Sequence, residues 1–342
     1  MLVASITLVS ALHVPDAVDT AARIDTGHRM HLGGDAVSVA RAVAERADRL
    51  DRLCGPDADH GLVVSLAPGT DVRAVGMMLA NAARAEHGDD RILRHVVSVL
   101  RADDVARLLW GDVDDAFVAA DRIASLVEYA TVVVLDRIEP LSGRRRRALV
   151  SLLHRLAPNA VVLAGPAVRG PRDLPVSNGG AARFLASGAG WMRGLSGAAD
   201  HGRDEHDELV TLRYREPLPF HPGRLAATIE QDLAPGVNGR VLRSKGFFRL
   251  ASRPDHLGSW SSLGAMLSLD PTANASWDPD APVGQAIWFV GERLDVPGIE
   301  RALDRALLTP SELLAGPDLW RTWADPFPVW PALDPSHGHH GD

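Results

Sequence analysis

The first half of the chain alternates short apolar runs with longer stretches in which apolar residues recur every three or four positions. The short runs are rich in Val, Ile and Leu and predict buried strands over residues 2–10, 62–66, 93–100, 131–135 and 160–163. The stretches between them predict helices over residues 36–53, 72–86, 117–129 and 144–156. Strands that alternate with helices form parallel βαβ units, so we expect a doubly wound, mostly parallel α/β sheet over residues 1–190. The sequence from His31 to Gly34 reads only as a glycine turn.

The pattern changes after residue 165, where Gly, Pro, Ala and Ser become frequent and a charged stretch follows. We interpret residues 191–208 as a linker. Beyond it the pattern predicts strands over residues 208–214, 240–251, 257–269 and 285–290, with helices over 222–233 and 296–307. This order favours a smaller α+β domain over residues 209–328, with an antiparallel sheet and helices on one face. From residue 326 the chain is rich in Pro, Gly and His, and we expect residues 329–342 to be a flexible tail.

Composition narrows the classes of function. The net charge of −8 gives the whole molecule no bulk attraction to nucleic acid. Cys54 is the sole cysteine, which excludes an internal disulfide and any multi-cysteine metal site. No apolar run reaches the roughly 18 residues that a membrane span needs, and the apolar start lacks the positive residues of a signal peptide. We therefore expect a cytoplasmic protein without a membrane partner.

Lys245 is the only lysine in the chain, and this limits the chemistry. A phosphate-binding loop of the GxxxxGK[ST] type needs its lysine to neutralise phosphate charge. No such loop exists here. No Ser/His/Asp arrangement, paired-carboxylate motif or GxGxxG fingerprint stands out either.

A set of motifs in the second half nevertheless resembles the C-terminal domain of the CobW-type metallochaperone GTPases. The motifs are PFHPGRL (219–225), VLRSKGFFRLASRPD (241–255), Trp260-Ser261, WFVGERLD (288–295) and ALLTPSELLAGPDLWRTWADPFP (306–328). The resemblance extends weakly to ITLVSALHVPDAVD (6–19), which is similar to the family's first strand and phosphate loop, and to LVEYATVVVLDRIEPL (126–141), which is similar to the segment leading to its guanine motif NKxD. The resemblance implies a degenerate GTPase-like domain followed by a CobW C-terminal domain.

The departures from that family concern its chemistry. Ala17 holds the position of the phosphate-loop lysine, Val18 holds that of the Mg²⁺-binding hydroxyl, and the family's CxCC metal motif is absent. In the guanine motif, Asp136 cannot donate as asparagine does, while Arg137 could stack on a base and Glu139 could accept from a guanine edge. Losing both the lysine and the Mg²⁺ ligand removes the main stabilisation of phosphoryl transfer, so we expect no GTP hydrolysis. Weak GTP binding at Asp136, Arg137 and Glu139 is the alternative to a bare strand end.

Histidines supply the candidate zinc ligands. His337, His339 and His340 place three imidazoles within four residues of the tail, and His201 and His206 flank carboxylates in the linker. Neutral imidazole suits Zn²⁺. The alternatives are a polar tail and a solvated linker. His221 precedes Pro222 and is expected to cap or pack a helix.

Basic residues supply the candidate contact surfaces. Arg144, Arg145, Arg146 and Arg147 open a helix and could contact a phosphate backbone such as that of ribosomal RNA, or simply be solvated. Arg243 and Lys245 share one face of a predicted strand and, with Arg249 and Arg253, could form a basic strip beside several aromatic residues. For the aromatic residues, packing in the core is the alternative.

The leading functional hypothesis follows from the resemblance. The chain is similar to a divergent actinobacterial branch of the family that is linked to zinc limitation and recruits a hibernation factor to the ribosome. This implies a non-catalytic adaptor whose partner is a hibernation factor, the ribosome or both. The alternative is a zinc-trafficking metallochaperone with residual GTP binding, and a third hypothesis is a structural role in oligomerisation.

Overall fold

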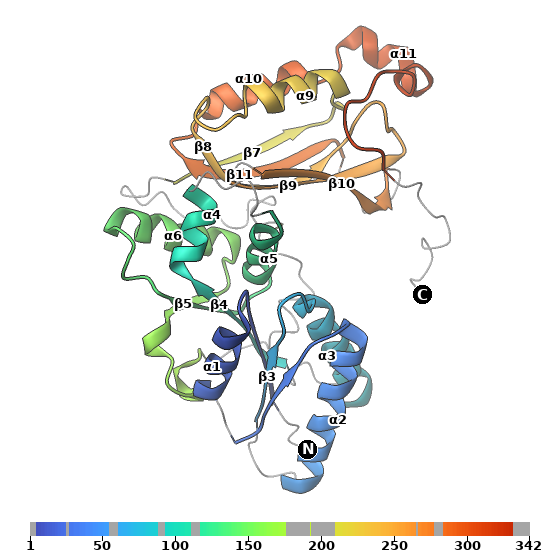
Figure 1. The fold of residues 1–342 in the computed structure, drawn as a ribbon. Helices are drawn as coiled ribbons and strands as arrows, with labels where there is room; N and C mark the ends of the chain where they lie inside the picture. Colours follow the sequence, from blue (N-terminus) through green and yellow to red (C-terminus); the bar gives the residue numbers. More distant parts are fainter. Residues whose placement is uncertain are drawn as a thin grey trace. The chain divides into compact units, whose positions relative to one another are not determined.

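The chain forms two compact units in the computed structural model, Met1–Arg193 and Gly194–Asp342 (Figure 1). The structure describes residues 5–24, 27–54, 61–87, 93–110, 117–175, 192, 209–264, 266–276 and 283–330. The predicted linker, residues 191–208, lies almost wholly outside the described residues. Its boundaries therefore stay a prediction.

A six-stranded parallel sheet is the centre of the N-terminal unit, in the order β2-β3-β1-β4-β5-β6. This confirms the predicted doubly wound α/β class. The strands are β1 (Ser5–Ala11), β2 (Arg29–Leu32), β3 (Gly61–Leu66), β4 (Leu93–Arg101), β5 (Val132–Asp136) and β6 (Val161–Ala164). The α-helices are α1 (Val14–Ile24), α2 (Ala36–Cys54), α3 (Val72–His87), α4 (Ala102–Trp110), α5 (Phe117–Glu128) and α6 (Gly143–Leu156), and two short 3-10 turns follow β6, η1 (Gly165–Ala167) and η2 (Pro171–Asp173).

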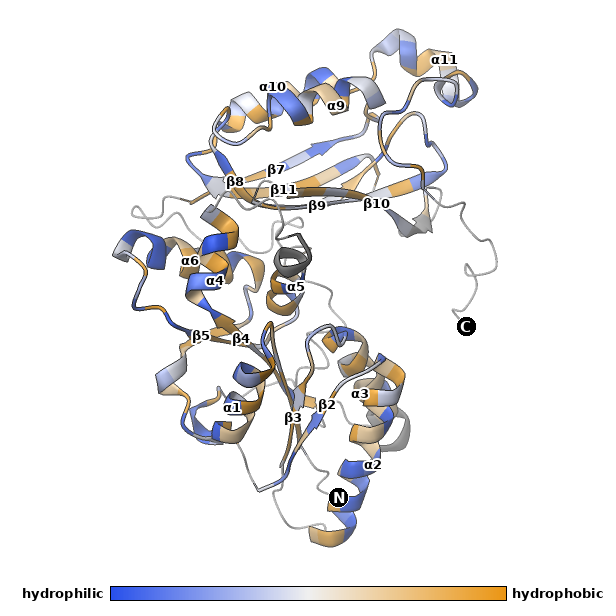
Figure 2. Cartoon of the chain, in the orientation of Figure 1, coloured by the Kyte–Doolittle hydropathy of each residue, from blue (hydrophilic) through white to orange (hydrophobic). Residues whose placement is uncertain are grey.

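Both faces of this sheet are buried, as continuous apolar strands require. On one face Ile6 and Leu8 of β1 pack with α2 and α3. On the other face Val9 and Ala11 pack with α1. Figure 2 shows the strands of this sheet largely in the apolar colour, with mixed colours on the surrounding helices.

The sequence prediction missed two α-helices and one strand of this unit. Helix α1 was interpreted as a decayed phosphate loop, and α4 follows β4 without any turn residue that would mark its start. The prediction of a glycine turn at 31–34 was wrong, because His31 and Leu32 belong to β2. That strand has only four residues, RMHL, and half of them are exposed, so it lacks the apolar signal of a buried strand.

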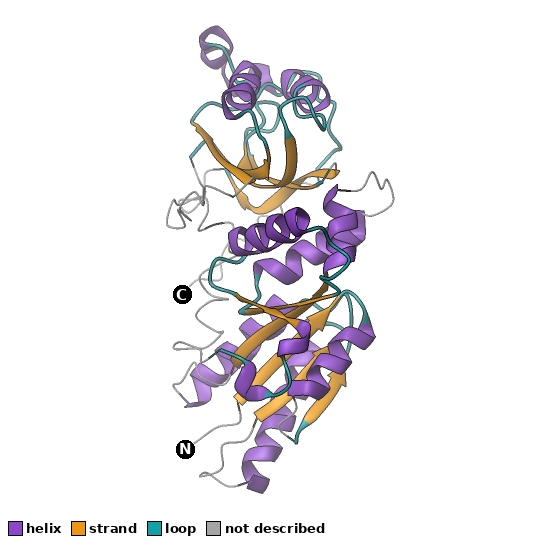
Figure 3. Cartoon of the chain, turned by 90° about the vertical axis from the view of Figure 1, so that its left-hand side faces the viewer, coloured by secondary structure: helices purple, strands orange, loops and turns teal. Residues whose placement is uncertain are grey.

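The C-terminal unit contains a five-stranded antiparallel sheet in the order β10-β9-β8-β11-β7. The strands are β7 (Leu209–Glu216), β8 (Arg240–Phe248), β9 (His256–Leu263), β10 (Met266–Ala275) and β11 (Gln285–Glu292). Helices α9 (Pro222–Gln231) and α10 (Val296–Ala306) lie side by side on one face, as predicted (Figures 1 and 3). Between sheet and helices lies a core that includes Phe220, Phe248, Trp260 and Phe289.

The last described segment closes the edge of this core. Helix α11 (Pro310–Trp320) was not predicted as a separate element. Phe327 and Trp330 pack against the core, and Trp330 Nε1 donates to Leu269 O at 3.1 Å. The expectation of a disordered chain from residue 326, with a flexible tail from 329, was therefore wrong for residues 326–330. These two aromatic side chains bury apolar surface that the Pro-rich composition did not reveal.

None of the described helices combines the length and apolar character that crossing a bilayer requires. The cytoplasmic location stays a prediction.

Candidate functional site

The turn between β1 and α1 is where a phosphate-binding loop would lie. Only Leu12 and His13 separate the strand from the helix. The backbone N–H groups of Asp16 and Ala17 lie 3.2 and 3.5 Å from His13 O as hydrogen-bond donors. In a phosphate-binding loop such groups must point at the phosphate instead. The helical start of α1 therefore leaves no open cradle.

An internal carboxylate takes the place of an anionic ligand at this turn. Asp16 lies in the first turn of α1 and accepts from Arg101 Nε and Nη2 at 2.7 and 2.8 Å. Arg101 ends β4, which is hydrogen-bonded to β1. The Asp16 carboxylate raises the pKa of Arg101 further above its usual value. A negative side chain at a helix N-terminus stabilises the helix, and it would repel a phosphate there.

A second polar contact joins the same turn to α4. His13 Nε2 and Asp104 Oδ2 lie 2.8 Å apart. Asp104 also accepts from Arg107 at 3.2 Å. No sequence pattern predicts these contacts, because Arg101 and Asp104 lie about ninety positions from the turn and α4 was not predicted. With them, the turn is tied to both β4 and α4.

The two positions at which the resemblance places the lysine and the Mg²⁺ ligand have structural roles. Ala17 is fully buried and packs with Val9 and Ala21 in the core of the α1 face. Val18 is 38% exposed and carries no oxygen. Neither position could contact a metal or a phosphate.

The DRIE segment after β5 does not gather its side chains into a base-binding site. Asp136 faces α1, with its Oδ2 3.7 Å from Arg23 Nη2, and it lies against Gly165, where an added Cβ would clash with the carboxylate. Arg137 has a positive φ of 53°, and its exposed guanidinium lies 3.9 Å from Asp103. Glu139 is exposed in the following turn. Of the three predicted nucleotide contacts, Asp136 is engaged within the fold and the other two face solvent.

In the C-terminal unit, His221 caps and packs a helix, as the sequence predicted. Its Nδ1 accepts from Arg224 N at 3.4 Å at the start of α9, and its ring stacks on Trp323 at 4.8 Å. Arg224 in turn donates to both Glu312 oxygens, at 2.9 and 2.6 Å. This pairing lowers the pKa of Glu312 to about 2. The motif FHPGRL thus joins α9 to the start of α11.

A family model decides the identity of this unit. The model of the cobalamin synthesis protein cobW C-terminal domain matches residues 209–307. This part of the chain is therefore similar to the CobW C-terminal domain and is called the CobW domain below. The resemblance stated from the motifs is confirmed for this part of the chain, and the CobW domain begins at β7 and ends directly after α10.

Two curated relatives extend the similarity beyond the CobW domain. The zinc-regulated GTPase metalloprotein activator 1 of Dictyostelium discoideum is 29% identical over an alignment of 231 residues, and the match covers 60% of this chain and 48% of that protein. A zinc chaperone of Mycobacterium tuberculosis is 27% identical over an alignment of 266 residues, and the match covers 66% of this chain and 58% of that protein. Both matches are longer than the C-terminal unit, so they reach into the N-terminal unit. Each match spans only about half the length of the relative.

A solved structure, the Zn(II)-bound YjiA GTPase from E. coli, has a TM-score of 0.36 and 14% identity, and the match covers 90% of this chain and all of that one. A similarity this low supports no conclusion about function.

The predicted basic strip of the CobW domain is largely engaged in the fold. Arg243 is 1% exposed and donates to Ser261 Oγ at 3.0 Å and Ser262 O at 2.8 Å. Lys245 is half-buried in the same strand and lies opposite Trp288 of β11. Arg249 donates to Ser276 O, and Arg253 donates to Asp325 Oδ2 and lies over the Trp330 ring. The buried aromatic residues Phe248, Trp260 and Trp288 pack inside rather than present a stacking surface.

The remaining predicted site residues are either exposed or lie outside the described residues. Arg144, Arg145, Arg146 and Arg147 are all exposed at the start of α6. His201, His206, His337, His339 and His340 lie outside the described residues. Within the described part of the chain, no three His, Cys, Asp or Glu side chains come together as a metal site would require. The zinc ligands therefore stay a prediction.

Proposed function

We propose that this protein takes part in zinc trafficking as a CobW-domain protein that works without hydrolysing GTP. The observation that carries the proposal is the similarity to a zinc chaperone over 66% of the chain, which includes part of the N-terminal unit as well as the CobW domain. The name of the second relative also refers to zinc. Zinc is the cargo in this proposal rather than a resident cofactor.

The closed β1–α1 turn is the reason to separate this function from GTP hydrolysis. Phosphoryl transfer depends on a cation and on backbone donors that are aimed at the phosphates. Here the donors bond within the helix and a carboxylate occupies its N-terminus. These residues do not fit a nucleoside triphosphate, and the proposed mechanism contains no step through one.

The tail histidines His337, His339 and His340 are the proposed zinc ligands, with His201 and His206 as a second, weaker pair. A small cluster of imidazoles binds Zn²⁺ weakly and releases it readily, which suits a protein that passes a metal on. Cys54 is exposed but stands alone, so thiolate ligation within one chain is not part of the proposal.

Zinc titration of the full chain tests the proposal. Competition against a fluorescent zinc chelator should give a Kd of about 10 μM or tighter. Changing His337, His339 and His340 together to alanine should weaken binding about tenfold or more, whereas changing His201 and His206 should have the smaller effect. The two variants are matched controls for each other, since both remove only imidazoles outside the described fold. Absence of zinc binding by the unchanged chain would contradict zinc trafficking.

A nucleotide assay tests the second half of the proposal. Purified protein with GTP and Mg²⁺ should release no phosphate above the background rate. The D. discoideum relative, assayed in parallel under the same conditions, is the comparison. GTP turnover by this chain would contradict the proposed separation from hydrolysis. Calorimetric GTP binding that Glu139→Ala abolishes would instead support residual nucleotide binding.

A role as an adaptor at the ribosome remains the second candidate. The observation that favours it is the exposed run Arg144–Arg147, because cations at a helix N-terminus oppose the helix dipole and would be stabilised by a polyanionic partner. The protein should then co-sediment with ribosomes under zinc limitation. The double change Arg145→Glu and Arg147→Glu should abolish this, and absence from the ribosomal fraction at every zinc level would contradict it.

A further inference from the structure

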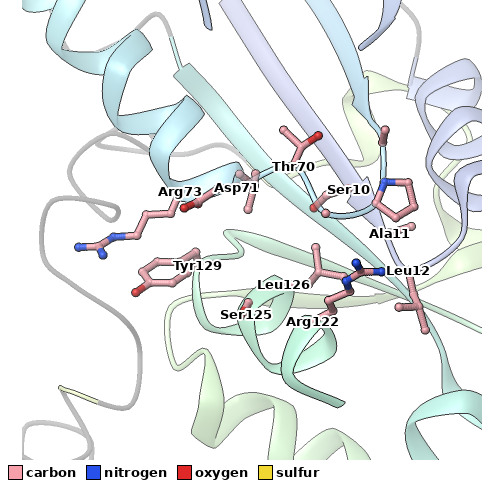
Figure 4. A pocket seen from close by; sticks show the side chains of 14 residues that line it. Ser10, Ala11, Leu12, Thr70, Asp71, Arg73, Arg122, Ser125, Leu126 and Tyr129 are labelled. Atoms are coloured by element: carbon pink, nitrogen blue, oxygen red, sulfur yellow. The ribbon is translucent and has the colours of Figure 1, made fainter. Parts of the chain in front are cut away.

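The N-terminal unit has a cavity of about 380 Å³ at the carboxyl ends of β1 and β3. Its walls come from Ser10–Leu12, the β3–α3 turn and α5 (Figure 4). The connection from β1 to β2 runs through α1 on one face of the sheet, and the connection from β3 to β4 runs through α3 on the opposite face, so these adjacent strands lead to opposite faces. Crevices at such a switch point are where open α/β sheets bind ligands. A volume of this size is in the range of small-molecule sites.

This cavity is separate from the closed β1–α1 turn. Helix α1 packs on the face of the sheet that carries Val9 and Ala11. The cavity opens on the opposite face, where Val72 of α3 packs with Leu8, and where Ser98 Oγ donates to Leu126 O of α5 at 2.7 Å. No residue of α1 lines it. A ligand here would therefore not use the N-terminus of α1.

One lining cation, the exposed Arg122, forms no ion pair with a carboxylate of the described residues. Figure 4 shows the Arg122 side chain extending from α5 toward the end of β1. Its Nη2 lies 3.7 Å from the point where a Cβ on Gly69 would sit, and Gly69 has a φ of +92° that favours glycine. In the part of the chain that the structure describes, no carboxylate is paired with Arg122. Arg73, by contrast, lies over the Tyr129 ring at 5.0 Å at the other side of the cavity.

Two hydroxyl groups in the lining are poorly satisfied. Thr70 Oγ1 is buried and has no hydrogen-bond partner. Ser10 is 4% exposed, and its Oγ makes only one long contact, 3.5 Å from Val97 O. Buried hydroxyls normally have partners, and leaving one unpaired costs about 1–3 kcal/mol. Both groups therefore have hydrogen-bonding capacity that the described part of the fold leaves unused.

The acidic group of the lining has another role, and apolar side chains form part of the wall. Asp71 Oδ1 accepts from Ala74 N at 2.9 Å and so caps α3. Leu12, Leu126, Pro68 and the Tyr129 ring supply the apolar surface. Among the described residues, the lining thus combines the Arg122 guanidinium and two poorly satisfied hydroxyls, those of Ser10 and Thr70, with apolar side chains.

We propose that this cavity binds a small organic anion, whose carboxylate or phosphate contacts Arg122, Thr70 and Ser10 and whose apolar body lies against Leu126 and Tyr129. Guanidinium and hydroxyl donors suit both kinds of oxyanion. The apolar wall selects for an anion that carries a carbon skeleton rather than for an inorganic ion. This site is additional to zinc handling and does not depend on it.

Titration of the full chain with phenyl phosphate and with benzoate, followed by NMR, tests the site. At least one should bind with a Kd below about 10 mM, and inorganic phosphate should bind more weakly. The preferred probe identifies the oxyanion. Arg122→Gln should weaken that binding about ten- to a hundredfold, because a charge-assisted contact is lost. Arg41→Gln, an exposed arginine on α2, is the matched control and should bind as the unchanged chain does.

The second variant, Thr70→Val, distinguishes loss of a ligand contact from loss of binding caused by misfolding. Removing an unpaired buried hydroxyl with little change in shape should leave the melting temperature unchanged or raise it. It should nevertheless weaken probe binding severalfold. Binding that is unaffected by both Arg122→Gln and Thr70→Val, or no binding of either organic probe, would overturn the proposal and leave a water-filled cavity. Equal binding of inorganic phosphate would overturn the apolar part of it.

Discussion

The two units use their buried and half-buried polar groups differently. In the CobW domain these groups hold the core together: Gln285 is 1% exposed and bonds Arg249 and Leu218, and Ser244 accepts from Trp260 and contacts Ser262. In the N-terminal unit the ion pairs of Asp16 and Asp104 gather at the β1–α1 turn. The first arrangement belongs to a domain that matches its family model, whereas the second fills a place that a nucleotide would need. On the proposed function, similarity to a zinc-related GTPase need not bring GTP hydrolysis with it, because the turn after β1 differs.

Trp260→Ala is the largest expected perturbation and tests whether the CobW domain is a unit of stability. Trp260 is 1% exposed, meets Phe248 and Phe289 edge-on at 6.1 Å, and donates to Ser244 Oγ at 2.7 Å. Truncation should destabilise the C-terminal unit by about 3–5 kcal/mol. Urea unfolding followed by near-UV circular dichroism should show this transition moving to lower urea.

The control is Leu314→Ala, which removes a side chain that is 87% exposed and should change the unfolding free energy by no more than about 0.5 kcal/mol. If Trp260→Ala shifts all unfolding signals together, the two units do not unfold independently. The CobW domain would then not be a separate unit of stability.

His95 makes the N-terminal unit the more sensitive one to mild acid. The side chain is 3% exposed on β4, and burial, together with the charge of Arg94, lowers its pKa from 6.5 to about 4. Below pH 6.5 His95 is protonated in the unfolded chain, whereas in the folded chain it is protonated only below about pH 4. Stability should therefore fall as the pH drops through this window, by up to about 3 kcal/mol.

Unfolding measured at pH 7 and pH 4.5 checks this. The substitution His95→Leu removes the titratable imidazole together with its unpaired Nδ1. The stability of the variant should therefore depend much less on pH over this range. A dependence that survives in the variant would show that other groups cause it.

The sequence predicted most regular elements but not the β1–α1 turn. Long apolar runs such as residues 131–135 specify buried strands locally, and the CobW motifs specified the second domain. Helix α1 was missed because its sequence was interpreted as a phosphate loop, and the Asp16–Arg101 pair joins residues 85 positions apart with no spacing rule. The packing of Trp330 was missed for a related reason, since a Pro-rich composition does not show whether an aromatic side chain packs against a core that is distant in sequence.

The pair Asp16–Arg101 can be measured by a double-mutant cycle. Its side chains are 16% and 21% exposed, and it is bidentate, so the coupling should be about 2 kcal/mol, well above that of a surface pair. Asp16→Ala alone should cost at least as much, because Arg101 is left without its partner. Chemical denaturation of the four proteins measures the cycle. A coupling near zero would mean that the turn is closed by the helix geometry alone.

Thr309→Ala is the smallest expected effect and concerns the corresponding helix start in the C-terminal unit. Thr309 Oγ1 accepts from Glu312 N at 3.3 Å, and Glu312 Oε2 accepts from Thr309 N at 2.8 Å, which is a capping box. Losing the cap should cost about 1 kcal/mol, and Thr309→Ser should cost less because it keeps the hydroxyl.

The pKa of Glu312 is lowered to about 2, chiefly by Arg224. The carboxylate therefore stabilises the fold above its usual pKa of 4.5, and this contribution is lost as the pH falls toward 2. Glu312→Gln should therefore match the unchanged chain at pH 2 and be less stable at pH 6. Equal stability of the two at pH 6 would show that Arg224 needs no charged partner at the helix start.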